Sequence, residues 1–262
     1  MPKILVLVPF PMAADQLALR QAQSKGVPLE PGTTLHYRPV KAAPRTYVSQ
    51  QDYVLADLSL FEAGLSAQAD GFDAVIIDTV SDSGVNALRS MLDIPVVGPG
   101  RAMFLNALML GDRFSILAMW KHWSGLYKKT LTELGLMERL ASVRSIDIVP
   151  DNRNLLGGKE EDVFPKLLEA GKRAIEEDGA DVLLLGSTTM HQAHGYLAER
   201  LPVPVINPGP LSYKMAETAI ALRLSHSRAG YPKPMVEKSA MVRAMMDGAA
   251  AAERGRPVEK LS

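Results

Sequence analysis

Two stretches of the sequence read alike: residues 69–79, ADGFDAVIIDT, and residues 177–187, EDGADVLLLGS. They align without a gap, and the same three residue types recur in order, as Asp70, Gly71 and Asp73 in the first stretch and Asp178, Gly179 and Asp181 in the second. Each stretch contains a short, continuous apolar run, which is typical of a parallel strand covered on both faces. The chain therefore consists of two halves with related sequences.

The match extends to the flanks of both stretches. LDIPVVGPG (92–100) corresponds to LPVPVINPG (201–209), and KILVLVPF (3–10) to RFSILAMW (113–120). LHYRPV (35–40) likewise corresponds to SVRSIDIV (142–149). Each half thus contains four short apolar runs.

Helical patterns such as 51–69 and 160–178 separate the apolar runs. Alternating strands and helices predict an α/β fold with doubly wound parallel sheets. The repeat predicts two similar domains, each with a four-stranded parallel sheet, related by pseudo-twofold symmetry with a cleft between them. We expect residues 1–98 with 210–262 to form the first domain and residues 99–209 the second.

The bulk composition narrows the class of protein. Of 262 residues, 47% are hydrophobic and 22% charged, and 29 Lys and Arg balance 29 Asp and Glu without a basic run. Nucleic acid is therefore not expected as a partner, because phosphate binding depends on clustered positive charge. The apolar run near the start is too short to span a bilayer and has no small-residue cleavage site, so we expect no membrane association and a cytoplasmic location.

The absence of cysteine excludes disulfides, thiolate metal sites and thiol catalysis. No G-x-G-x-x-G follows the first apolar run, which makes dinucleotide binding a weak hypothesis. His191 and His194 have a spacing that can hold a metal, but no third ligand is placed by the sequence. We therefore expect neither a cofactor nor a metal site.

Ligands of open parallel sheets bind beyond the carboxyl ends of the strands. In each half a polar loop follows the third predicted strand, with substrate-facing positions at Thr79, Val80 and Ser81 and at Ser187, Thr188 and Thr189. We predict that helices begin at both loops, so that the backbone N–H groups of 79–82 and 187–190 can bind an anionic group. The hydroxyl groups of the loops would donate further hydrogen bonds. Pro9 and Phe10, after the first strand, are expected to add a stiff apolar wall. The alternative is that the hydroxyls only cap helices, a position that Ser and Thr favour.

The layout resembles the aspartate/glutamate/hydantoin racemase superfamily over nearly the whole chain. The resemblance rests on two segments, AVIIDTVSDSG (74–84) and VLLLGSTTMHQA (182–193). Each is followed by a predicted helix and then by IPVVGPG (94–100) or VPVINPG (203–209). The tail LSHSRAGYPKP (224–234) also looks like the end of hydantoin-racemase-type members.

The resemblance implies a cysteine at each of two positions, where this chain has Thr79 and Ser187. In the family one thiol removes a proton from the substrate and the other returns one on the opposite face. A hydroxyl has a pKa far above that of a thiol, so neither residue is expected to act as a base unaided. The resemblance still implies a small-molecule substrate with carboxylate or imide oxygens held between the loops. It also implies a homo-oligomer, for which segment 101–110 and the C-terminal helices offer contacts.

Three other residues are candidates for moving a proton. His122 lies in LAMWKHWSG (117–125), next to Trp120, which would line an aromatic pocket; the alternative is a solvated loop. His191 is expected in the first turn of a helix, close to the second loop. Asp78 ends an apolar run, where partial desolvation could raise its pKa and make it a base, or where backbone amides could hold it ionised.

The leading hypothesis is an isomerase that transfers a proton next to a carbonyl of a small carboxylate or cyclic amide, with donated hydrogen bonds stabilising the enolate. The alternatives are a decarboxylase or lyase, and a ring-opening hydrolase with Ser187 as nucleophile and a nearby histidine as base. A third is a binding protein that keeps the cleft and has no catalysis.

Overall fold

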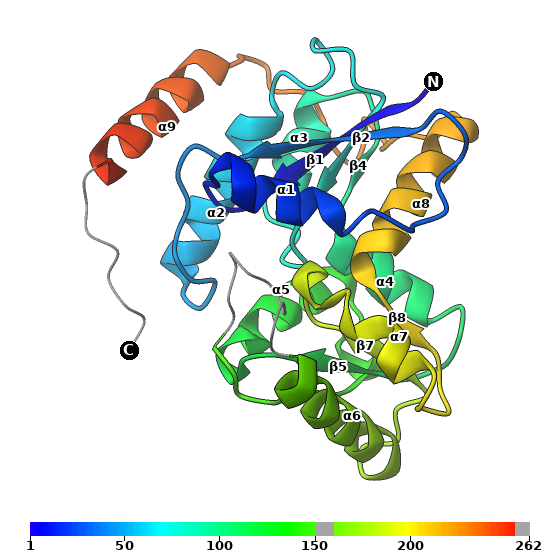
Figure 1. Cartoon of the computed structure of the whole chain (residues 1–262). Coiled ribbons are helices and arrows are strands. Elements are labelled where there is room, and N and C mark those ends of the chain that lie inside the picture. The colour runs from blue at the N-terminus through cyan, green and yellow to red at the C-terminus, as the bar shows by residue number, and fades with distance from the viewer. Residues whose placement is uncertain (150–159, 255–262) are drawn as a thin grey trace.

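The computed structural model describes residues 1–149 and 160–254, and in this part of the chain the strands form two four-stranded parallel sheets (Figure 1). The first sheet has the order β2-β1-β3-β4, with β1 (Lys3–Val8), β2 (Thr34–Pro39), β3 (Ala74–Ile77) and β4 (Val96–Val97). The second has the order β6-β5-β7-β8, with β5 (Phe114–Ala118), β6 (Leu140–Ser145), β7 (Val182–Leu185) and β8 (Val205–Ile206). The predicted pair of doubly wound α/β sheets is confirmed, with the same strand order in both.

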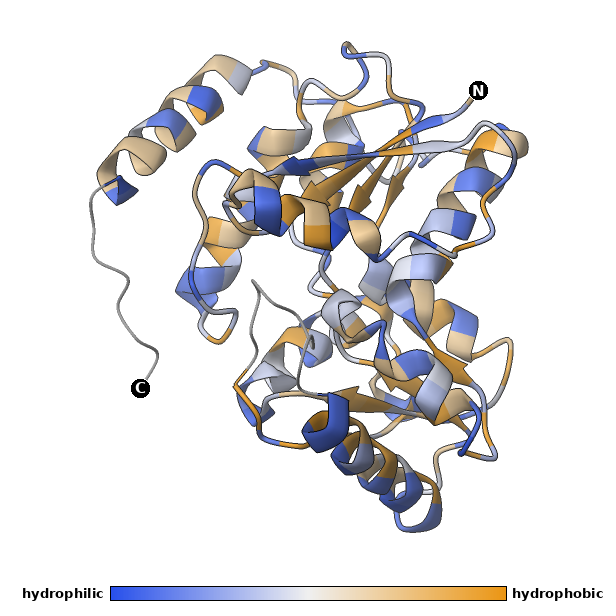
Figure 2. Ribbon diagram, in the orientation of Figure 1, coloured by the Kyte–Doolittle hydropathy of each residue, from blue (hydrophilic) through white to orange (hydrophobic). Residues whose placement is uncertain are grey.

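The central strands are almost entirely apolar because helices cover both faces of each sheet. Every residue of β3, β5 and β7 is buried, whereas β2 and β6, at the sheet edges, are partly exposed. Figure 2 shows the same contrast in the hydrophobic colour of the inner strands. The buried Ser115 inside β5 is paired with Ser142 at 2.8 Å between hydroxyl oxygens, and the residues of β3 and β7 are all apolar.

Helices connect the strands in both halves. They are α1 (Ala14–Ala22), α2 (Gln50–Gly64), α3 (Val85–Met91), α4 (Pro99–Ala107), α5 (Ser124–Leu134), α6 (Glu160–Glu176), α7 (Ala193–Ala198), α8 (Pro208–Ala221) and α9 (Ser239–Glu253). Short 3₁₀ turns are η1 (Lys121–Trp123), η2 (Met137–Arg139) and η3 (Thr188–Met190). Within the described residues, none of the helices is long and apolar enough to cross a membrane.

Helices α4 and α8 pack against each other and join the two sheets (Figure 1). Helix α8 contacts β3 and β4 of the first sheet, whereas α4 contacts β7 and α5 on the second. Each half thus ends in a helix that packs on the other half. The division into a domain of residues 1–98 with 210–262 and a domain of residues 99–209 remains a prediction.

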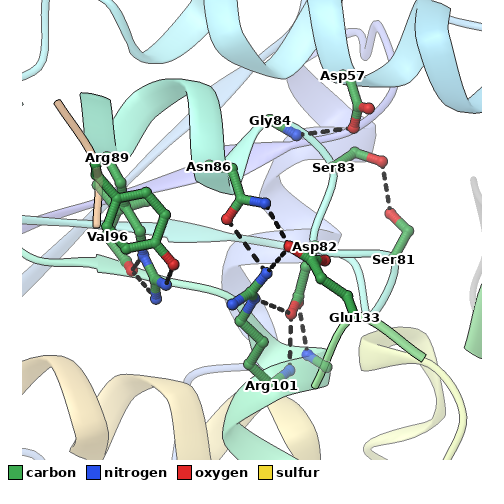
Figure 3. A network of polar contacts seen from close by, with 12 residues as sticks. Asp57, Ser81, Asp82, Ser83, Gly84, Asn86, Arg89, Val96, Arg101 and Glu133 are labelled. Atoms are coloured by element: carbon green, nitrogen blue, oxygen red, sulfur yellow. Dashed lines mark hydrogen bonds and ion pairs between the residues drawn. The ribbon is translucent and has the colours of Figure 1, made fainter. Parts of the chain in front are cut away.

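Asp82 connects the loop after β3 to the start of α4. Its Oδ1 accepts a hydrogen bond from Gly100 N and its Oδ2 one from Arg101 N, both at 2.7 Å (Figure 3). A Cβ on Gly98 would lie 2.5 Å from the Asp82 carboxyl carbon, and one on Gly100 would lie 2.4 Å from Val80 O. The two glycines of GPG therefore leave room for the carboxylate to close this helix end.

The end of β7 has room for a glycine only. A Cβ on Gly186 would lie 2.4 Å from Tyr127 Oη and 2.8 Å from Leu117 O. Tyr127, which is fully buried, donates a hydrogen bond from Oη to Gly186 O at 2.8 Å. The matching position in the first half is Asp78, so the two strand ends differ in chemistry for a steric reason.

We expect Gly186→Ala to lower the free energy of unfolding by about 1–3 kcal/mol, because the added methyl group forces Tyr127 and the β5 backbone to shift. Urea denaturation measures the change. Gly195→Ala is the matched control: its Cβ would meet no atom within 4 Å, and alanine is favoured inside α7, so this variant should be as stable as the parent or slightly more stable. Equal stability of both variants would show that the space at Gly186 is not restricted.

Candidate functional site

The loops after β3 and β7 meet at one cavity between the two halves. Eight of the predicted site residues line it: Pro9, Phe10, Asp78, Thr79, Val80, Ser187, Thr188 and Thr189. The cavity volume is about 30 Å³, which is small beside the few hundred Å³ of a typical ligand pocket. The two halves therefore lie close together at this point.

A hydrogen bond joins the two halves directly at this cavity. Thr188 Oγ1 donates to the backbone oxygen of Asp78 at 3.2 Å, although the residues are 110 positions apart. Both residues are buried, with 3% and 4% of their surface exposed. The loops are thus in contact, as the predicted pseudo-twofold arrangement requires.

A buried ion pair forms the floor of the cavity. Arg20, from α1, donates from Nε to Asp78 Oδ2 at 2.7 Å and from Nη2 to Asp78 O at 3.3 Å. Their side chains are only 2% and 5% exposed, and buried charges persist in proteins when they are paired in this way. Two atoms of the pair have no hydrogen-bond partner among the described residues: Arg20 Nη1, which is fully buried, and Asp78 Oδ1.

The hydroxyl groups of the second loop are bonded to each other. Ser187 Oγ and Thr189 Oγ1 lie 2.8 Å apart, and Ser187 Oγ also accepts a hydrogen bond from Thr189 N at 3.2 Å. None of these partners is a base. The hypothesis of Ser187 as a nucleophile activated by histidine therefore has no supporting contact among the described residues.

The first loop differs from the expected helix opening. Helix α3 begins only at Val85, so the N–H groups of 79–82 do not form its first turn, and α7 begins only at Ala193. Between β3 and α3, Asp82 has a left-handed backbone (φ 53°) and its carboxylate is bonded to the start of α4. The prediction that the N–H groups of 79–82 begin a helix was therefore wrong; in the second loop, the single turn η3 follows Ser187.

The remaining predicted residues lie outside the cavity lining. Ser81 is fully buried and its Oγ lies 3.2 Å from Thr79 Oγ1 and 3.0 Å from Ser83 Oγ. His122 is exposed, with its ring 4.7 Å from the ring of Trp120. From this segment it is Trp123 that reaches the cavity.

His191 lies at the end of η3 and is only partly exposed. Its Nδ1 is buried and has no hydrogen-bond partner among the described residues. Burial, and then the charge of Arg20, lower the pKa of His191 to about 4. The imidazole is therefore neutral near pH 7, and it lies close to Arg20 although it does not line the cavity.

His194 does not line the cavity, and its Nε2 lies 3.0 Å from Val205 O. Among the residues that the structure describes, no group of three or more His, Asp or Glu side chains is placed to hold a metal ion. The chemistry available at the cavity is thus that of an ion pair, several hydroxyls and aromatic walls.

Five residues at the cavity are not among the predicted site residues: Arg20, Tyr47, Trp123, Leu126 and Gly186. Tyr47 comes from the loop after β2; its ring packs edge-on against Phe10 at 5.5 Å, and its Oη donates to Pro9 O at 3.4 Å. Burial raises the pKa of Tyr47. For Arg20 a signal existed, because a carboxylate at the end of a buried strand, Asp78, requires a countercharge.

The known proteins that are similar to this chain include several racemases. The family model described as Asp/Glu/Hydantoin racemase matches residues 18–216. A hydantoin racemase of Pseudomonas sp. (strain NS671) is 30% identical over 70% of this chain and 72% of the relative. Another, of Paenarthrobacter aurescens, is 28% identical over 87% of this chain and 97% of the relative. The solved structure of allantoin racemase from Klebsiella pneumoniae is similar with a TM-score of 0.80 and 25% identity, covering 90% of this chain and 95% of that one.

The lowered pKa of His191 predicts how stability depends on pH. In the unfolded chain an imidazole titrates near 6.5, and in the folded protein His191 titrates at about 4. Between these values the unfolded state binds more protons, so the stabilisation is present above pH 6.5 and is lost as the pH falls toward 4. The free energy of unfolding of the parent should therefore fall more steeply over this range than that of His191→Gln.

Urea denaturation at several pH values between 7.5 and 4 measures both slopes. His122→Gln removes an exposed imidazole and should keep the parent's pH dependence. Parallel curves for the parent and His191→Gln would contradict the burial of a neutral imidazole at this position.

Proposed function

The chain belongs to the Asp/Glu/hydantoin racemase family, and on that premise we propose that it transfers a proton at the carbon next to a carbonyl of a small ring amide, as the names of its hydantoin and allantoin racemase relatives suggest. The substrate is held in the cavity between the loops after β3 and β7. Because the chain has no cysteine, the reaction proceeds without a thiol.

Asp78 is the proton acceptor in this proposal. It is the one carboxylate among the described residues that line the cavity. Arg20 anchors Oδ2, whereas none of the described residues forms a hydrogen bond with Oδ1, which is thus open to receive a proton. A carboxylate is a far more suitable base near neutral pH than the hydroxyl of Thr79 or Ser187. This free carboxylate oxygen in a closed cavity is the observation that carries the proposal.

The hydroxyls hold the substrate. Thr79, Thr188 and Ser187 present O–H groups from both loops, and each can donate to a carbonyl oxygen of the ring. Phe10 and Trp123 provide apolar surface for the rest of the ring. A cavity that excludes most water strengthens every one of these hydrogen bonds.

The two loops do not play equal parts. The first strand end has Asp78, and the second has Gly186, where Tyr127 leaves no room for a side chain. A base is thus available on one side of the substrate only. The enzyme should therefore remove the proton of one enantiomer more readily than that of the other.

Proton exchange in heavy water tests the proposal. With a panel of 5-substituted hydantoins and allantoin, the parent protein should incorporate deuterium at the ring carbon, and for one enantiomer incorporation should exceed inversion. Asp78→Asn keeps the shape of the side chain and removes the base, so exchange should fall about 10²–10⁴-fold. Nuclear magnetic resonance follows the exchange and chiral chromatography follows the inversion.

The matched control is Asp70→Asn, which removes a surface carboxylate paired with Arg38 and should leave exchange unchanged. Exchange that survives in Asp78→Asn would refute Asp78 as the base. Binding of the panel without any exchange by the parent would instead favour a non-catalytic binding protein.

We also propose that the protein is a homo-oligomer whose contacts include α4 and α8. Leu105, Met215 and Leu224 are 52%, 39% and 57% exposed and line one hollow of about 330 Å³. Met109 and Leu110, after α4, are 80% and 52% exposed. Apolar side chains gathered in this way are typical of a surface that another chain covers.

Leu105→Glu should shift the protein to a smaller species in light scattering coupled to size-exclusion chromatography, because a carboxylate at the contact loses its hydration. Val54→Glu changes a side chain that is 65% exposed on α2, outside segment 101–110 and the C-terminal helices, and should leave the size unchanged. A parent protein that elutes as a monomer, or the same size for both variants, would refute the contact.

A further inference from the structure

Arg20 is more than the structural partner of Asp78. Its side chain is 2% exposed, it lines the cavity, and its Nη1 is fully buried without a hydrogen-bond partner among the described residues. Leaving a buried polar donor unsatisfied costs about 1–3 kcal/mol. A guanidinium that only stabilised the fold would gain from a partner at this nitrogen.

The titratable side chains near the Arg20–Asp78 ion pair are uncharged near neutral pH. Tyr37 and Tyr213 feel the charges of both Asp78 and Arg20, and burial raises the pKa of each tyrosine. Tyr47 and His191 feel the charge of Arg20; burial raises the pKa of Tyr47 and lowers that of His191. All four are therefore neutral near pH 7. Among the described residues that line the cavity, Arg20 and Asp78 thus supply one positive and one negative charge.

We infer that Arg20 is a catalytic residue whose Nη1 donates a hydrogen bond to the substrate carbonyl oxygen, and that the cavity accepts a neutral ring amide in preference to a carboxylate. This inference rests on the proposed proton transfer to Asp78. Arg20 then stabilises the substrate oxygen that becomes negatively charged, and the preferred substrates are neutral rings.

The step keeps the charge of the cavity constant. The C–H bond next to the carbonyl breaks, its proton forms an O–H bond with Asp78 Oδ1, and its electron pair moves to the carbonyl oxygen to give an enolate. Before the step Arg20 faces the carboxylate of Asp78; after it, Arg20 faces the enolate oxygen while Asp78 is neutral. Return of the proton reverses each change. The guanidinium therefore has a countercharge at both ends of the step, without any ion entering or leaving the buried site.

The count of charges in the cavity also disfavours an anionic substrate. A carboxylate in the cavity would add a second negative charge beside Asp78, and two anions in a poorly hydrated site repel strongly. Its proton loss would then leave two negative charges for one guanidinium. A neutral hydantoin-type ring avoids both states.

Kinetics of Arg20 variants test the role. Arg20→Gln should lower kcat for deuterium exchange of a neutral 5-substituted hydantoin about 10²–10³-fold, the effect of losing an oxyanion donor, with KM changed only a few-fold. Arg20→Lys keeps the charge, and thus the pairing with Asp78, but lacks the forked geometry, so it should fold like the parent and still lose most of kcat. The variant Arg20→Gln/Asp78→Asn replaces a charged pair with a neutral one and provides a folded reference without either charge.

Binding of barbiturate provides a readout that needs no turnover. At neutral pH this ring is a stable anion of the enolate type. Its binding to the parent should take up one proton, because Asp78 must become neutral, and calorimetry in buffers of different ionisation enthalpy measures this uptake. Binding to Asp78→Asn should take up none and be about tenfold or more tighter, since the guanidinium then has no other anion. Arg20→Gln should bind barbiturate more weakly than the parent and bind neutral hydantoin with similar affinity.

The outcomes separate this inference from the proposed function. If Asp78→Asn abolishes exchange but Arg20→Lys and Arg20→Gln keep the kcat of the parent, Arg20 is structural and only the inference fails. Barbiturate binding without proton uptake, or no binding, also overturns it. If a carboxylate-bearing ring is exchanged faster than its neutral counterpart, the assigned substrate class is wrong. If exchange persists in Asp78→Asn, the proposed function fails first.

Discussion

The central strands of both sheets are covered on both faces, and this requirement decides where chemistry is possible. A strand such as β3 or β7 is fully buried, so a polar group inside it would lose its hydration without compensation. The first positions where polar side chains are tolerated are the strand ends, Asp78 and Ser187 among them. Because both sheets are parallel, these ends gather at one edge of each sheet, and the exchange of α4 and α8 between the halves brings the two edges together.

The sequence predicted what depends on local pattern. The apolar runs and their repeat indicated both sheets, and the loops after β3 and β7 were placed correctly at one cavity. Arg20 could not be placed in the same way, because its contact with Asp78 depends on how α1 packs beneath the first sheet. Tyr47 is a similar case, since it belongs to a loop without a repeating pattern.

The departures from the predictions have physical reasons as well. The carboxylate of Asp82 accepts hydrogen bonds at the N-terminus of α4, and the loop after β3 does not itself begin α3 (Figure 3). His122 follows β5, as predicted, yet the turn η1 exposes its ring and directs Trp123 to the cavity instead. A one-residue difference in a tight turn reverses which side chain faces the ligand, and periodicity does not resolve it.

Tyr127 limits how the two copies of the repeat can diverge. In the first half the position after the third strand accepts an aspartate, Asp78, whose charge is paired with Arg20 on α1. In the second half the hydroxyl of Tyr127 and the backbone of β5 occupy the space where any side chain would begin. The second copy of the repeat is thus held to glycine at this position by its own packing. A charged side chain directly after the third strand has room in the first half only, so two sheets with one strand order end in different chemistry.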